Sequence, residues 1–477
     1  MKRLSVWLGL FVFATASGWT SWAVAQNQTT NLSPVLSSNE VPFTIQIEQA
    51  AFSLPSGLQS YVVGTSDGKW LLLAGRIGGL HGFNSGTNNF PPDTQNTTIF
   101  VVDPTAQTVA TRSLTNLAES GMTQTQIDLL SVTAPQWCQS KDILYMSGGY
   151  GVDESGTNFT TKDALTAIDI PGMMHWVVNP TNGETAVQYI RQIFDPIFQI
   201  TGGVMVEPSP NHVFLVFGQD FEGANIFTPD VTYSEQVRQF RIIESKRRFS
   251  FVAGKTLPAT PDPDYRRAGL NVVPIIENGR PSFAAFSGSF TTNFGIWTIP
   301  VEINSRGVPT EASPTNATTF MQGMNNFNCP TLQLYSQKER NSYTVLMGGI
   351  SFGFFATNGA FETDAELPFI NQVTTIKRDR HGVFSQYLMN AQYPVILSTE
   401  SNPGNQLLFG SSAVLIPTPG LPAYRNGVLN YDRLKTNSVV VGYIIGGIQS
   451  TLPNTNVESD SAASPYIFKV TLIPTPP

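Results

Sequence analysis

The chain is short of charge and of cysteine. Lysine, arginine, aspartate and glutamate make up only 13% of its 477 residues, about half the fraction usual in soluble domains. The net charge is −7, which argues against nucleic acid or an anionic membrane as the main partner. Two cysteines, Cys138 and Cys329, are too few for a disulfide scaffold. Whether these two form a single bridge stays open.

Long apolar runs are also missing from most of the chain. After residue 25 no stretch approaches the roughly 18 consecutive apolar residues of a membrane-spanning helix. At the N-terminus, Lys2 and Arg3 precede an apolar segment at 4–16, and small residues follow at 23–25. This order is typical of a secretory signal peptide over residues 1–25. We therefore expect a secreted or periplasmic protein that does not span a membrane.

Six apolar runs of strand length, each ending in glycine, are the most informative feature. They end at Gly75, Gly148, Gly218, Gly288, Gly348 and Gly446, at intervals of 73, 70, 70, 60 and 98 residues. Each follows another short apolar run across a turn rich in Asp, Asn, Gly or Pro, which is the pattern of a β-hairpin. A third and a fourth strand follow. Four antiparallel strands repeated six times predict an all-β, six-bladed β-propeller.

The ends of the chain indicate how such a ring would close. The last unit has three predicted strands and no fourth: Val428–Leu434, Val439–Ile445 and Tyr466–Leu472. Near the N-terminus, Phe43–Glu48 alternates apolar and polar residues, as a strand does. We predict that this segment becomes the outer strand of the last blade and closes a single domain over residues 43–473. Residues 26–42 are then a flexible N-terminal segment.

The longest interval between glycines leaves two interpretations open. It contains Gln406–Gly410, which looks like another glycine-terminated strand only 36 residues before Gly446. Residues 390–426 are then either an insertion into a six-bladed ring or part of a seventh blade.

The glycine-terminated second strand and the aspartate that ends the third strand, such as Asp103 before Pro104, resemble those of kelch and galactose-oxidase-type β-propellers. The resemblance covers most of residues 43–473. The Tyr and Trp of kelch units occur only in scattered cases here, such as Trp176. Galactose oxidases bind copper through Tyr and His, but the four histidines of this chain fall in four different units. We therefore expect no metal or other cofactor at a copper-type site.

The connections between second and third strands are long and acidic. Residues 76–97, 149–163, 219–235, 289–295, 349–371 and 447–465 hold 13 acidic residues and two basic ones, Arg76 and Lys162. They also carry many phenylalanines, which either form a recognition surface or pack the loops onto the ring. Our candidate ligand-binding residues are Asp153, Glu154, Asp220, Glu222, Phe227, Asp230, Phe354, Phe355, Glu362 and Asp364.

These features favour a monomeric, non-catalytic binding protein that recognises a protein, a glycan or a cationic ligand. The alternative is a periplasmic sugar-modifying enzyme, similar to the kelch propellers that mutarotate sialic acid. The acidic loops disfavour that anionic sugar, since it would require arginine. A calcium site around Asp220, Glu222 and Asp230 is a further hypothesis, because Ca²⁺ prefers clustered oxygen ligands.

Overall fold

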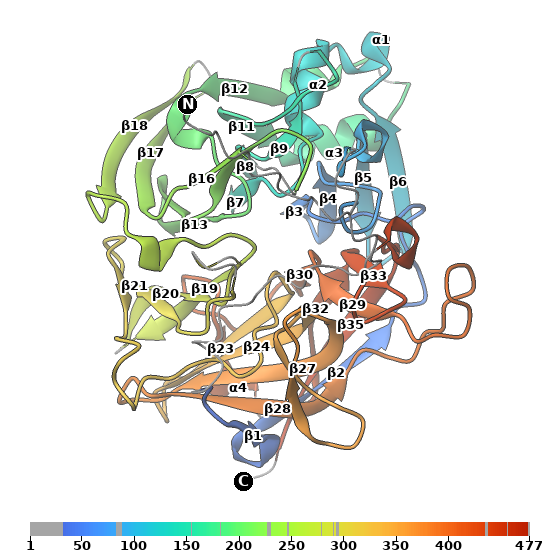
Figure 1. The fold of residues 1–477 in the computed structure, drawn as a ribbon. Helices are drawn as coiled ribbons and strands as arrows, with labels where there is room; N and C mark the ends of the chain where they lie inside the picture. The colour runs from blue at the N-terminus through green and yellow to red at the C-terminus, as the bar shows by residue number, and fades with distance from the viewer. Residues whose placement is uncertain are drawn as a thin grey trace, which may run out of the picture.

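The computed structural model describes residues 32–82, 88–153, 155–181, 183–226, 230–245, 248–277, 279–289, 291, 295–434, 437–455 and 457–475. This part of the chain consists mainly of β-strands, most of them in antiparallel sheets that follow one another around the molecule in chain order (Figure 1). The arrangement is propeller-like. No helix in these ranges is long and apolar enough to cross a membrane.

The described residues form five four-stranded antiparallel sheets and one six-stranded sheet whose four central strands are antiparallel. The first sheet consists of β3 (Val62–Ser66), β4 (Lys69–Leu73), β5 (Thr98–Asp103) and β6 (Thr108–Ser113). The second consists of β7 (Gln136–Ser140), β8 (Ile143–Ser147), β11 (Ala164–Asp169) and β12 (Ile190–Phe194). The third consists of β13 (Val204–Ser209), β14 (His212–Val216), β17 (Val237–Ser245) and β18 (Arg248–Leu257).

The second half of the chain repeats this pattern. The fourth sheet consists of β19 (Asn271–Glu277), β20 (Arg280–Phe286), β21 (Val301–Ile303) and β22 (Pro309–Glu311). The fifth consists of β23 (Thr331–Ser336), β24 (Asn341–Ile350), β27 (Phe369–Arg378) and β28 (Phe384–Gln392), with β31 (Leu429–Asn430) and β1 (Val35–Ser37) added in parallel at its edges. The sixth consists of β30 (Val414–Pro417), β32 (Val439–Ile445), β35 (Ile467–Pro474) and β2 (Phe43–Gln49).

Smaller elements fill the connections between these strands. Three hairpins are β9 (Tyr150–Val152) with β10 (Phe159–Thr161), β15 (Gln219–Glu222) with β16 (Asp230–Tyr233), and β25 (Gly353–Phe355) with β26 (Phe361–Thr363). A three-stranded sheet joins β29 (Leu408–Ser411), β33 (Ile448–Ser450) and β34 (Ser461–Ala463). The α-helices of the described residues are α1 (Leu117–Ser120), α2 (Gln124–Leu130), α3 (Ile170–Val178) and α4 (Tyr431–Leu434).

Each second strand ends in two residues with positive φ, and the second of them is always glycine. In the first sheet these are Ala74 and Gly75, with φ of 60° and 83°. A Cβ on Gly75 would lie 2.3 Å from the carbonyl oxygen of Gln59, so only glycine fits there. By this geometry, the second glycine of Gly148-Gly149, Gly348-Gly349 and Gly446-Gly447 is the counterpart of Gly75.

Neighbouring sheets share apolar cores. Separate hydrophobic clusters pack the first sheet on the second, the second on the third, the third on the fourth, the fourth on the fifth and the fifth on the sixth. A further cluster joins the first sheet to the last, since Leu72 and Phe100 pack with Ile416, Ile445 and Ile467. Every pair of adjacent sheets is therefore held by buried side chains.

Backbone hydrogen bonds connect the sheets just before their first strands. The N–H of Ala134 donates to the carbonyl of Ser60 (3.1 Å), that of Gly202 to the carbonyl of Ala134 (3.1 Å), and that of Gly269 to the carbonyl of Gly202 (2.8 Å). In the same way, the N–H of Ser412 donates to the carbonyl of Asn328 (2.7 Å), and that of Ser60 to the carbonyl of Ser412 (3.2 Å). The bond between Ser60 and Ser412 joins the N-terminal and C-terminal repeats. The N–H of Gly447 also donates to the carbonyl of Leu58, at 2.9 Å.

The N-terminal strand pairs as the sequence predicts. In β2, Phe43 lies opposite Pro474 and Gln49 lies opposite Phe468, in an antiparallel register with β35. Phe43, Ile45 and Ile47 are buried, as their alternation with polar residues indicates. This strand is the outermost of the sixth sheet.

The first strand of the sixth sheet is not where we expected it. The prediction of a strand at Val428–Leu434 was wrong, because β30 pairs with β32, whereas this segment forms β31 and α4. Leu429, Tyr431 and Leu434 are buried in the core that the fifth and sixth sheets share. Their apolar pattern therefore reflects burial between sheets and not a place in the sixth sheet.

One further segment bears on the question of a seventh blade, and another differs from its predicted flexibility. Leu408–Ser411, which contains the additional glycine, belongs to the small three-stranded sheet and starts no further four-stranded sheet in the described residues. Val35–Ser37 forms a strand inside the segment 26–42, for which the sequence indicated none. The open edge of β28 supplies the backbone partners for that strand.

Candidate binding face

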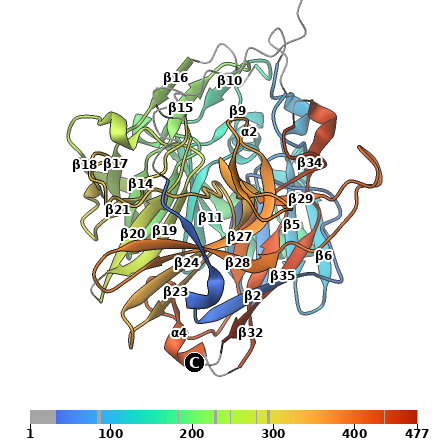
Figure 2. The ribbon, with the colours of Figure 1, turned by 60° about the horizontal axis from the view of Figure 1, so that its bottom comes forward.

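The connections between second and third strands gather at one end of the molecule. We call this end the hairpin face and define it as the described residues of 76–97, 149–163, 219–235, 289–295, 349–371 and 447–465. Figure 2 shows β9, β10, β15 and β16 together near its top. Because strands alternate in direction, the connections from each fourth strand to the next first strand run to the same end. These add charged residues that the sequence-based count left out, among them Asp262, Asp264 and Arg266.

Two of the hairpins are joined into one platform. The hydroxyl of Thr161 accepts a hydrogen bond from the N–H of Phe221 at 2.8 Å and donates to its carbonyl at 3.0 Å. The N–H of Gly223 donates to the carbonyl of Phe159, also at 3.0 Å. β10 and β15 are therefore fixed side by side, and the acids of β15 have a defined position.

Asp220, Glu222 and Asp230 lie on this platform. Glu222 is directly opposite Asp230 in the antiparallel register, and its carboxylate accepts a hydrogen bond from the hydroxyl of Thr160 at 2.6 Å. Burial, followed by the charge of Glu222, raises the pKa of Asp220. The described residues contain no group of three or more His, Cys, Asp or Glu side chains that could hold a metal ion. The calcium hypothesis therefore gains no support from this arrangement.

Asp153 organises a turn. Its carboxylate accepts hydrogen bonds from the backbone N–H and the hydroxyl of Ser155 at 3.0 and 2.5 Å, and from the side-chain amide of Asn158 at 3.0 Å. The Ser155 side-chain hydrogen bond is the main cause that lowers the pKa of Asp153 to about 2. Two other candidate residues, Glu154 and Phe227, lie outside the described residues.

The other four candidates lie on or beside the β25–β26 hairpin. Phe354 is opposite Glu362 in the register, and the Glu362 side chain is exposed. The ring of Phe355 lies edge-on to that of Phe361, with centroids 5.3 Å apart. Asp364 accepts a hydrogen bond from the side-chain amide of Asn454 at 2.8 Å. The structure therefore divides the described candidates into two groups, one in the connections of the second and third sheets and one in that of the fifth.

Several loop aromatics are packing residues. The ring of Tyr150 lies 5.0 Å from Phe90, 5.5 Å from Phe159 and 5.2 Å from Phe221, measured between centroids. These four rings come from three different loops and form a small apolar cluster with Val152. For these phenylalanines the packing interpretation applies, since their rings hold the loops together.

Both basic residues of the six loops form hydrogen bonds with other groups of the protein. Arg76 is only 5% exposed, and its Nη2 donates to the hydroxyl of Thr94 at 2.9 Å. The ammonium of Lys162 donates to the carbonyl of Val152. In contrast, Asp93, Asp230, Glu362, Glu366 and Glu458 are exposed. The described part of this face therefore presents carboxylates to solvent while its loop cations point inward.

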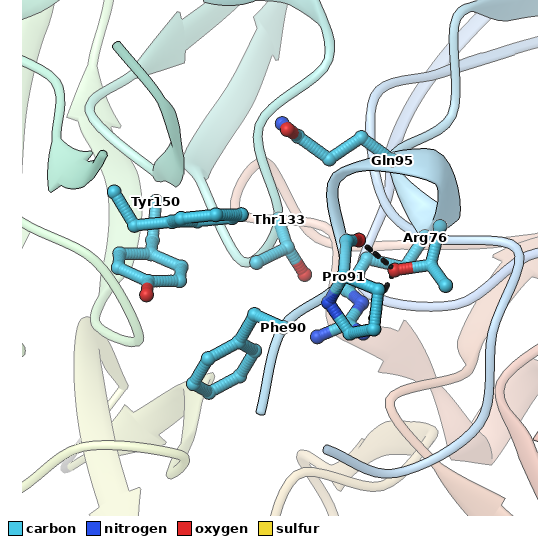
Figure 3. A pocket seen from close by; sticks show the side chains of 8 residues that line it. Arg76, Phe90, Pro91, Gln95, Thr133 and Tyr150 are labelled. Carbon is cyan, nitrogen blue, oxygen red and sulfur yellow. Dashed lines mark hydrogen bonds between the residues drawn. The ribbon is translucent and has the colours of Figure 1, made fainter. Parts of the chain in front are cut away.

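A small pocket lies beside Arg76 (Figure 3). It is lined by Arg76, Phe90, Pro91, Thr94, Gln95, Thr133, Tyr150 and Phe159. Arg76 and Tyr150 occupy corresponding places, each directly after the glycine that ends a second strand. The position after each such glycine is a signal that could have pointed to this pocket but was not used, and nothing in the sequence shows which of these side chains is buried.

A serine in a nucleophile-like motif and the two cysteines have structural roles. Residues 349–353 read Gly-Ile-Ser-Phe-Gly, a match to the Gly-x-Ser-x-Gly pattern of hydrolase nucleophiles, which we had wrongly taken to be absent from the sequence. Ser351 is fully buried; its hydroxyl donates to the carbonyl of Gly353 at 2.6 Å and accepts from the N–H of Asn325 at 2.8 Å. The cysteines Cys138 and Cys329 are free thiols, and burial raises the pKa of Cys329 to about 12. None of these groups is presented as a nucleophile.

Comparison with known proteins identifies a distant structural likeness. No protein-family model and no curated protein sequence matches this chain. The solved structure of YjhT is similar to it, with a TM-score of 0.43 and 12% sequence identity over 88% of this chain and 98% of YjhT. We base no argument on so distant a likeness. The four-stranded antiparallel sheets fit a propeller, and membership of the kelch family stays a prediction.

Proposed function

We propose that this protein is an exported, non-catalytic binding protein that recognises a cationic group of a protein or glycan through its hairpin face. In this proposal it is a monomeric, six-bladed β-propeller of kelch-like repeats. Its location in the periplasm or outside the cell rests on the signal-peptide pattern of residues 1–25, which precede the described part of the chain.

The proposal of a closed ring is supported by three independent contacts between the ends of the chain. These are the pairing of β2 with β35, the hydrogen bond from Ser60 to Ser412, and the cluster that packs Leu72 on Ile445. A ring held in this way presents its loops rigidly, as is typical of surfaces used for recognition.

The observation that supports a cationic ligand is the opposite placement of acids and bases on the hairpin face. The exposed acids come from four different connections, whereas Arg76 is buried and Lys162 is bonded to a backbone carbonyl. Carboxylates that converge on one face without neighbouring cations add their potentials and attract positive charge.

The shape of this face favours a surface contact. The pocket beside Arg76 has room for about one water molecule, whereas pockets that enclose small ligands usually measure about 300 Å³ or more. It is too small to enclose a sugar ring, so it gives the sugar-modifying alternative no support.

The test is binding of fluorescent poly-L-lysine, followed by anisotropy at low salt and at physiological salt. The triple variant Asp230→Asn, Glu362→Gln, Glu458→Gln removes three exposed acids from the hairpin face. We expect binding about tenfold weaker than that of the wild type, at roughly 0.5 kcal/mol for each exposed charge. Binding of the wild-type protein should weaken as salt is raised.

The matched control removes the same charge from the opposite end. Asp67→Asn, Asp142→Asn and Glu339→Gln alter exposed acids in turns between first and second strands. This variant should bind poly-L-lysine almost as the wild type does. Equal weakening in both triple variants would show that only net charge matters, and absence of binding at low salt would reject the proposal.

A further inference from the structure

Arg76 is a buried cation that lacks a carboxylate partner. Three other buried arginines, Arg112, Arg267 and Arg378, each form an ion pair with glutamate. No ion pair within 4.0 Å joins Arg76 to any acid of the described residues. Because an unpaired buried charge is costly, this arginine requires another explanation.

The side chain is held in place by its other contacts. Nη2 donates to the hydroxyl of Thr94 at 2.9 Å, and the guanidinium carbon lies 5.1 Å from the centroid of the Phe90 ring. Nε is buried and has no hydrogen-bond partner. The backbone is paired with that of Gln59 through two hydrogen bonds of 2.9 Å. The guanidinium therefore cannot easily swing out into solvent to recover its hydration.

Arg76 remains positively charged under ordinary conditions. Burial is the main cause that lowers its pKa, to about 10, and the charges of Glu458 and Asp93 oppose this shift. A pKa near 10 leaves the side chain protonated at neutral pH. The positive charge is thus present and only partly compensated by the protein itself.

The pocket lies where a compensating anion would fit. Its walls combine the Arg76 guanidinium with the rings of Phe90 and Tyr150, as Figure 3 shows. The space for about one water molecule is close to that needed by a halide ion or by one oxygen of a carboxylate group. Of the acids on the hairpin face, Asp93 and Glu458 act on Arg76 and oppose this binding, whereas salt screens those exposed charges that lie farther than about 8 Å away.

We propose that this pocket binds a small monovalent anionic group, either a carboxylate group or a halide, against the guanidinium of Arg76. The proposal rests on Arg76 and its neighbours and not on the cationic ligand of the hairpin face. Its failure would therefore leave the proposed function unaffected, and Arg76→Gln should not reduce binding of poly-L-lysine.

The experiment measures Tm while sodium acetate or sodium chloride replaces a bulky sulfonate at constant ionic strength. For the wild-type protein we expect a saturating rise in Tm with at least one of the two anions. Saturation with acetate alone identifies a carboxylate group, and saturation with chloride identifies a halide. In Arg76→Gln the apparent affinity should fall about tenfold or more, the usual effect of losing a charge-assisted hydrogen bond. Arg76→Lys, which keeps the charge, should retain part of the response.

Arg266→Gln is the matched control. Arg266 also lies over an aromatic ring at this end of the molecule, 3.9 Å from the centroid of Tyr233, but its charge acts on the nearby Glu235. This variant should keep the full anion response. A response that is the same in Arg76→Gln as in the wild type, or that does not saturate, would overturn the proposal. If Arg76→Gln does not fold, wild-type crystals grown with bromide and, separately, with acetate decide the question: an anomalous bromide peak or acetate density beside the guanidinium supports the proposal, and the absence of both rejects it.

Discussion

Replacing Glu311 with glutamine should strongly destabilise the fourth sheet, because it removes the partner of a buried charge. The Arg267 side chain is fully buried and Glu311 is 9% exposed, with 2.8 Å between Nη2 and Oε1. Burial lowers the pKa of Arg267 to about 10, so the guanidinium is charged at pH 7. Its Nη1 donates to the carbonyls of Ile299 and Ser287 at 2.9 and 3.3 Å, which holds it inside the protein when Glu311 is replaced.

The magnitude follows from this geometry. Removing one member of a buried ion pair usually costs about 3–5 kcal/mol, because the other charge stays buried without compensation. The exposed pair between Lys469 and Glu48 has a similar distance of 2.9 Å, but its side chains are 39% and 42% exposed. Breaking that pair by Glu48→Gln should cost at most about 1 kcal/mol. The two variants thus compare the loss of a buried ion pair with the loss of an exposed one whose nitrogen–oxygen distance is nearly the same.

Because burial raises the pKa of Glu311 to about 7, both costs are measured by urea unfolding at pH 8.5, where this carboxylate is ionised, and are followed by tryptophan fluorescence and circular dichroism. The double variant Arg267→Met, Glu311→Leu should be much more stable than Glu311→Gln, since it leaves no charge buried. Equal losses of stability in Glu311→Gln and Glu48→Gln would refute the reasoning. A double variant as unstable as Glu311→Gln would show that packing and not charge determines the loss.

Two further predictions concern glycine geometry and acid titration. Gly75→Ala should cost at least about 3 kcal/mol in urea unfolding, because its Cβ would lie 2.3 Å from the Gln59 carbonyl oxygen. Gly68 also has positive φ but would place its Cβ with no atom within 4 Å, so Gly68→Ala should cost only about 1–2 kcal/mol. Equal costs in the two variants would contradict the close approach at Gly75. Asp153, with its pKa lowered from 3.8 to about 2, should contribute stability that is present above pH 4 and is lost as pH falls through 2. Ser155→Ala should raise that pKa towards 3.8 in an NMR titration of the carboxyl carbon, and an unchanged pKa would exclude the serine as its cause.

Much of the fold could be predicted because its signals are local. The turn at Asp67-Gly68, the glycine at the end of each second strand and the alternation in Phe43–Glu48 all depend on backbone geometry within a few residues. The strand at Val428–Leu434 was predicted wrongly because burial between two sheets produces the same apolar pattern as a strand. β30 was missed because its four residues carry too short a pattern.

The candidate site could be predicted only in outline. The number and sign of the charges in the long connections are sequence facts, and strand alternation places those connections at one end. The sequence could not show that the Asp153 carboxylate accepts hydrogen bonds from Ser155 and Asn158, because this depends on the conformation of the turn. Nor could it show that Phe90 packs on Tyr150, because these residues come from loops whose relative positions depend on the whole ring.

By itself, the sequence determined the repeat, the strand polarity and the acidity of one end, because each follows from the order of residues along the chain. Only the tertiary structure decided which charges face solvent. Arg76 and Asp230 both lie in polar loops, yet one is buried beside Phe90 and the other is exposed on β16. The difference arises from packing between neighbouring repeats, since desolvation depends on all the atoms around a group and not on its neighbours in sequence.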